Sequence, residues 1–200
     1  MKHVRSLRRV SGPEVEPVSV ADAKLHLRVD SETDDTYIAG LVSAAREWCE
    51  VYTDRTFVHT QYAMTMDTFP WEIELPRPPV AVAAGNTATA VTYAQETGGT
   101  ATLPTSEYRV DRTAEPGVIR TVYAGTWPSH LIDRNSISVT WWAGYGEDGT
   151  KVPKVVKSAI LMLVGHWYEV RSSVLTGSIS KEIEFGVHAL LDSIKWGSYR

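Results

Sequence analysis

The sequence has almost no cysteine, no long hydrophobic run and little net charge. Cys49 is the one cysteine in 200 residues, which excludes an internal disulfide framework and a multi-cysteine metal site and permits a reducing compartment. No run of about 18 apolar residues could cross a membrane, and no apolar stretch of signal-peptide length follows the basic N-terminal residues. A formal net charge of -4 is not that of a nucleic-acid polycation. We therefore expect a soluble, non-secreted protein without a membrane partner.

Catalytic signatures are missing as well. The sequence has no nucleophile elbow, no phosphate-binding glycine loop and no zinc-protease helix. The glycines of "GYGEDG" follow a predicted strand and lack the Gly-Lys-Ser/Thr of a P-loop. His166 and Glu169 offer two metal ligands at helical spacing, but no second pair completes a shell. We expect no enzyme, no cofactor and no metal.

The acidic stretch "DSETDD" imitates the start of a calcium loop without completing it. Asp30, Glu32 and Asp34 occupy the first odd positions of such a loop. Asp35 then stands where a glycine is needed, and Leu41 where the bidentate glutamate is needed. The acids are better interpreted as the start of a helix, whose free N–H groups favour negative charge.

Helical periodicity marks both ends of the chain. Ser19 and Asp22 predict a capped start for a short helix over about 20–27. Apolar residues three and four apart predict a long helix over about 34–53, with Cys49 on its buried stripe as a small core residue. The same period returns after Pro153, predicting a helix to about Arg171, a Ser- and Gly-rich loop over 172–180, and a final short helix ending near 196.

Between the helices the period changes to two, over about 57–145. Alternating segments separated by Gly-Gly, Pro-Gly and Gly-rich turns predict antiparallel strands at 60–67, 72–75, 90–94, 100–103, 108–110, 117–123 and 136–145. The predicted fold class is α+β: a helical core built from N- and C-terminal helices (about 20–53 and 153–196) with an inserted antiparallel β module.

The charges are unevenly distributed along the chain. Residues 1–12 carry four bases and no acid (Lys2, Arg5, Arg8 and Arg9), whereas residues 13–54 carry ten acids against three bases. We interpret 1–12 as a basic N-terminal arm and 13–200 as a single domain. The arm is either a solvated tail or a candidate docking arm for another subunit or for nucleic acid.

The segment "IELPRPPV", residues 73–80, begins as a half-buried strand and then meets three prolines. Pro76, Pro78 and Pro79 remove amide donors and fix φ, which confines the segment to an edge or an exposed loop. A stiff connector between two strands is the simpler interpretation.

The succession of segments resembles a known family. "PVSVADAKLHLRVDSETDDTYIAGLVSAAREWCEVYTDRTF" is followed in order by "IELPRPPV", "YRVD", "WPS", "VTWWAGYG", "VPKVVKSAILMLVGHWYEVR" and "FGVHALL". This order resembles the head–tail connector (adaptor) family of tailed bacteriophages and gene transfer agents. The resemblance spans about 17–191 and rests on the succession rather than on one diagnostic motif.

The resemblance implies a structural virion protein, assembled in the host cytoplasm and placed in the neck at the capsid vertex. Such proteins form a ring of about twelve copies docked under the portal protein. In a ring subunit, a preordered loop carrying Arg77 would meet a neighbouring subunit at little entropic cost, so the candidate subunit-interface residues are Pro76, Arg77, Pro78 and Pro79. The ring extends the channel through which genome DNA passes without sequence-specific binding, and it docks the next neck or tail protein. Two other classes remain open: a tail-completion or adhesion module that binds through the β section, and a DNA-binding regulator. The regulator suits a basic arm, but "SAAREWCE" offers one Arg where a recognition helix needs several polar contacts.

Overall fold

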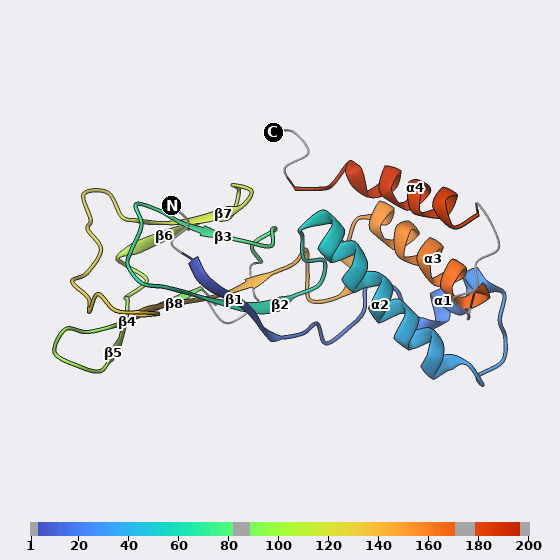
Figure 1. Ribbon diagram of the computed structural model, residues 1–200, viewed down its shortest axis with the longest axis horizontal. Helices are drawn as coiled ribbons and strands as arrows, with labels where there is room; N and C mark the ends of the chain where they lie inside the picture. Colours follow the sequence, from blue (N-terminus) through green and yellow to red (C-terminus); the bar gives the residue numbers. More distant parts are fainter. Residues whose placement is uncertain (1–3, 82–88, 171–178, 197–200) are drawn as a thin grey trace. The chain divides into compact units, whose positions relative to one another are not determined.

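The computed structural model describes residues 4–81, 89–170 and 179–196 (Figure 1). The chain divides into a β unit (Met1–Pro13 and His59–Glu147) and a helical unit (Glu14–Val58 and Asp148–Arg200). Each unit is therefore built from two separate stretches of sequence. No helix in the described ranges is both long enough and apolar enough to span a bilayer.

The described residues of the helical unit form four α-helices and one 3-10 turn. They are α1 (Val20–Leu27), α2 (Asp35–Thr53), the 3-10 turn η1 (Gly149–Lys151), α3 (Lys154–Glu169) and α4 (Ile179–Asp192). The first three predicted helices are confirmed, with ends that move by one or two residues. The last helix begins at Ile179, inside the loop expected over 172–180, and residues 171–178 of that loop lie outside the described part of the chain.

Local sequence explains where the first two helices begin and end. Ser19 Oγ accepts a hydrogen bond from Asp22 N at 3.0 Å, and Asp22 accepts one from Ser19 N at 3.4 Å, which completes the predicted capping box. The helices α1 and α2 both stop at residues in the left-handed region, Arg28 (φ 57) and Asp54 (φ 54). The stripe of α2 buries Ile38, Val42, Ala45 and Cys49. The helix α2 packs against α3, which α4 also contacts.

In the β unit, the residues that the structure describes form eight strands in two antiparallel sheets. They are β1 (Val4–Ser11), β2 (Thr60–Met66), β3 (Ile73–Leu75), β4 (Ala90–Ala94), β5 (Thr100–Thr102), β6 (Tyr108–Asp111), β7 (Gly117–Thr121) and β8 (Ile137–Ala143). One sheet has the order β1-β2-β8-β4-β5 and the other has the order β3-β7-β6. Both sheets contribute to one buried hydrophobic core, as in a β-sandwich.

The central pair of strands shows why the period of two was informative. The strands β2 and β8 pair without a bulge from Thr60↔Ala143 to Met66↔Ile137. Alternate residues of β8 are buried, and Trp141 among them is fully inaccessible to solvent. The predicted α+β fold, with an antiparallel β module between helices from the two ends of the chain, is confirmed. The segment expected as a separate arm contains β1, so residues 4–11 belong to the five-stranded sheet.

Candidate functional site

The proline segment connects the two sheets. The strand β3 ends at Leu75 in the three-stranded sheet, whereas Val80 forms an isolated bridge with Ala143 of β8 in the other sheet. The oxygen of Pro79 accepts a hydrogen bond from Gly144 N at 2.9 Å. The chain therefore leaves one sheet at Leu75 and joins the other at about Pro79.

Side chains in this crossover are partly or fully covered. Pro78 is buried, while Pro76, Arg77 and Pro79 are half-buried. Arg77 has φ 66, a left-handed conformation that costs energy in a non-glycine residue. The three prolines have no backbone N–H and therefore cannot donate hydrogen bonds to a neighbouring strand. Their backbone carbonyls can still accept them. The position of these four residues at a subunit boundary stays a prediction.

The basic residues of the N-terminal segment lie along one edge of the five-stranded sheet. Arg5, Arg8 and Arg9 belong to β1, which pairs with β2 on one side and ends the described sheet on the other. Arg8 and Arg9 are exposed, and Lys2 lies outside the described residues. Cationic side chains are common on sheet edges because they oppose uncontrolled strand pairing.

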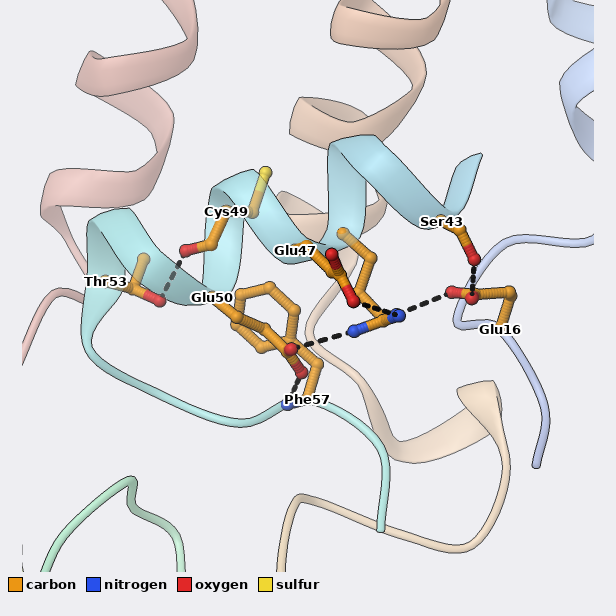
Figure 2. Close-up of polar contacts among 8 residues, drawn as sticks. Glu16, Ser43, Glu47, Cys49, Glu50, Thr53 and Phe57 are labelled. Atoms are coloured by element: carbon orange, nitrogen blue, oxygen red, sulfur yellow. Dashed lines mark hydrogen bonds and ion pairs between the residues drawn. The ribbon is translucent and has the colours of Figure 1, made fainter. Parts of the chain in front are cut away.

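A buried ionic cluster holds the middle of α2 (Figure 2). Arg46 Nε donates to Glu16 at 2.7 Å, and Arg46 Nη1 donates to Glu50 at 2.9 Å. Glu50 also accepts the backbone N–H of Phe57 at 2.9 Å, and Ser43 Oγ donates to Glu16. The cluster thereby ties α2 to the segment before α1 and to the chain that follows α2.

Electrostatics favour the charged form of this cluster. Burial by itself lowers the pKa of Arg46, but the hydrogen bond to Glu16 and the charges of Glu50, Glu16 and Glu47 outweigh burial and raise it. The Arg46 side chain is 4% exposed and that of Glu50 is 9% exposed, so both need partners inside the protein. Sequence reasoning missed this cluster, because Arg46 was judged only as a candidate DNA contact. Its burial removes it from any nucleic-acid surface of α2.

The acidic stretch before α2 serves helix contacts. Tyr168 of α3 donates its hydroxyl to Asp34 at 2.6 Å, and Lys24 of α1 forms an ion pair with Asp35 at 2.7 Å. Within the described ranges, no group of three or more His, Cys, Asp and Glu side chains could hold a metal ion. Cys49 is fully buried, as the helical stripe predicted, and burial raises its pKa to about 12.

One end of the β unit exposes large apolar side chains on loops that are firmly held. Phe69 stacks on Trp127 with ring centroids 4.7 Å apart, and Trp127 Nε1 donates to Pro70 O at 2.7 Å. Leu131 N donates to Ala94 O at 2.9 Å, which fastens the long loop before β8 to the end of β4. The two loops, 67–72 and 122–136, are therefore fixed to each other and to the sheet.

These loops carry what we call the apolar tip: Trp71 (86% exposed), Tyr123 (99%), Leu131 (42%) and Ile132 (80%). Three of the four lie in the twelve-residue run "TVYAGTWPSHLI" (121–132), which contains no Asp, Glu, Lys or Arg. Exposed aromatic residues on a rigid support are typical of protein-binding surfaces. The sequence signal for this surface is the uncharged run itself, which has no regular alternation of apolar and polar residues.

Comparisons with known proteins agree with this architecture. Residues 17–96 match the sequence profile of the family described as "Phage gp6-like head-tail connector protein". No curated protein sequence matches the chain.

Solved structures give matches over nearly the whole chain. A chain in the neck of an empty GTA particle, computed with C6 symmetry, superposes with a TM-score of 0.76 at 20% identity over 95% of both chains. A chain in the virion of a native gene transfer agent (GTA) particle gives 0.72 at 20% identity over 94% of both chains. A third, in the neck of a native GTA particle computed with C12 symmetry, gives 0.72 at 20% identity over 95% of this chain and 94% of that one. The chain thus shares its fold with these neck and virion chains, and through residues 17–96 it resembles the phage gp6-like head-tail connector family.

Proposed function

We propose that this protein is a structural subunit of a head–tail connector ring in the neck of a tailed phage or gene transfer agent. The observation that carries the proposal is the fold shared with a GTA neck chain over 95% of both chains. The family match over residues 17–96 supports it independently. The ring has about twelve copies, sits under the portal protein and extends the DNA channel.

The interior of the protein is organised for rigidity rather than catalysis. Arg46 and Glu50, the most buried charged residues of the described ranges, form an ion pair, and Glu50 also accepts a backbone hydrogen bond from Phe57 N. A rigid subunit loses little conformational entropy when it enters a ring, so less of the interaction free energy is offset and the net free energy of assembly is more favourable. The crossover of Pro76, Arg77, Pro78 and Pro79 is stiff in the same sense, and we place it at or near a subunit boundary.

The apolar tip suits the downstream neck or tail protein. It lies at the end of the β2–β8 pair formed by Met66 and Ile137, opposite the end at which the chain enters and leaves the β unit. Exposed apolar and aromatic side chains match an apolar protein partner better than they match DNA phosphates. Replacing Trp71 and Tyr123 by Ala is expected to abolish binding of that component while rings still form.

Passage of DNA is favoured by the acidity of the helical unit. Its N-terminal part has five exposed acids: Glu14, Asp22, Asp30, Glu32 and Glu47. Negative charge facing a channel repels phosphates and prevents the genome from adhering. We therefore expect no shift of duplex DNA by the purified protein at moderate salt.

Negative-stain imaging of the protein, alone and with portal protein, tests the proposal. Rings on the portal are the expected result. A monomer or dimer that binds duplex DNA would instead indicate a regulator, and rings that bind only tail components would indicate a tail-completion module. Deletion of residues 1–12 is not a clean probe of the basic segment, because it removes β1 from the sheet; substitution of single arginines is preferable.

A further inference from the structure

The two edges of the five-stranded sheet carry opposite charge. The strand β1 at one edge has three arginines and no acid. At the other edge, the β4–β5 hairpin (residues 90–102) has one acid, Glu96, and no base. The strand that follows, β6, belongs to the other sheet and carries both signs. Both edges belong to one sheet of the β unit, so the strand order by itself places them on opposite sides of that sheet.

The basic edge strand β1 exposes apolar side chains as well as arginines, which protection against strand pairing does not explain. Arginines oppose uncontrolled pairing of an edge strand. Yet the same short strand exposes two large apolar side chains, Leu7 (40%) and Val10 (49%), which would favour association. Arg8, between them in sequence, is itself exposed. A strand that combines apolar contact area with charge of one sign is suited to a partner of the opposite sign.

The acidic edge is a well-defined hairpin. Gln95 N donates to Gly99 O at 3.0 Å and Gly98 N donates to Gln95 O at 3.0 Å. Gly98 (φ 91) and Gly99 (φ 88) take the left-handed conformations that the turn requires. Glu96 is therefore held in an exposed turn beside β5, where a neighbouring molecule can reach it.

We propose that the β1 edge of one copy lies against the β5 edge of the next copy around the ring. The inference rests on the ring proposed above and names the surfaces that form it. Ring contacts between identical subunits join two different surfaces of the chain, and the contact repeats until the ring closes. The opposite edges of one sheet are such a pair of surfaces, and their charges attract.

Strand directions are compatible with this arrangement. Four successive antiparallel pairings separate β1 from β5, so the two strands run in the same direction within a copy. Twelvefold symmetry, as in the matched GTA neck, rotates each copy by 30° (360/12). Strand twist of about 20–25° at each of the four pairings is together larger than this rotation, so β1 of one copy and β5 of the next cross at an angle and touch through side chains. Because β5 has only three residues, side-chain attraction dominates over ladder hydrogen bonds, and rings should weaken as salt increases.

A charge swap tests the contact. Arg8→Glu is expected to weaken ring formation about tenfold or more, as is Glu96→Arg, because each places like charges across the contact. The variant with both substitutions is expected to recover rings. Ring formation is measured by negative-stain imaging and sedimentation, alone and on portal protein. Arg28→Glu, at an exposed arginine of the helical unit, is the control with the same change in net charge.

The outcomes separate this inference from the proposed function. Wild-type rings with unchanged assembly of both single variants would show that the edges do not meet. Loss of rings in Arg8→Glu that Glu96→Arg does not restore, in proteins with wild-type thermal unfolding, would place the basic edge against another protein and overturn the inference. Absence of wild-type rings on portal protein would refute the proposed function itself and this inference with it.

Discussion

Arg46→Met removes the buried guanidinium of α2 and leaves Glu50 without its ion pair. Glu50, a residue that is 7% exposed, then keeps the hydrogen bond from Phe57 N but has lost its cationic partner. Removing one partner of a buried pair destabilises a protein by about 3–5 kcal/mol, because the remaining charge stays desolvated. Glu16, whose side chain is 28% exposed, can return to water and adds little. The free energy of unfolding should therefore fall by about 3–5 kcal/mol.

The assay is urea unfolding of the full chain followed by far-UV circular dichroism. The matched control is Arg120→Met, which removes an ion pair of similar length, 2.6 Å to Glu72, from a side chain that is 63% exposed. An exposed pair contributes at most about 1 kcal/mol, so this variant should unfold almost as the wild type does. Equal losses in the two variants would refute the argument that burial determines the importance of Arg46.

Three further predictions follow from single contacts. Cys49, with its pKa raised to about 12 by burial, should not react with a thiol reagent at pH 8 until the protein is unfolded; equal rates in the native and unfolded protein would contradict this. The hydrogen bond to Asp192 raises the pKa of Tyr52 from 10 to about 12. The stability that this bond contributes is therefore complete below pH 10 and is lost as pH rises through about 12. Unfolding curves of Tyr52→Phe should lack this loss of stability at high pH. Gly117→Ala would place a Cβ 2.4 Å from Val80 Cγ2 and should cost about 1–3 kcal/mol of unfolding free energy, whereas Gly12→Ala, with open space around it, should be nearly neutral.

The helices could be predicted because their burial is periodic, and the same periodicity contained an overlooked signal. Arg46 follows the buried Val42 by four residues, and Glu50 follows Arg46 by four. A basic and an acidic residue at this spacing, on the stripe that the apolar residues define, indicate a buried ion pair. Counting only apolar residues along the stripe concealed it.

The first strand and the pairing of the sheets could not be predicted in the same way. Leu7 and Val10 are three residues apart and both partly exposed, so β1 has no period of two to detect. Its place in the sheet depends on pairing with β2, more than fifty residues away. The prolines after Leu75 showed that a strand ends, but the sheet that the chain joins next is decided by distant contacts with β8.

The insertion of the β unit between α2 and α3 has a consequence for the order of folding. Helix α2 ends at Thr53 and its partner α3 begins at Lys154, so joining them in an unfolded chain requires closing a long loop. The β unit brings the ends of that loop together, since Thr60 pairs with Ala143 and His59 N donates to Gly146 O at 2.9 Å. During synthesis the apolar stripe of α2 stays exposed until α3 has left the ribosome. If the β unit folds first, it holds the ends of α2 and α3 close together, and only the docking of the two helices remains.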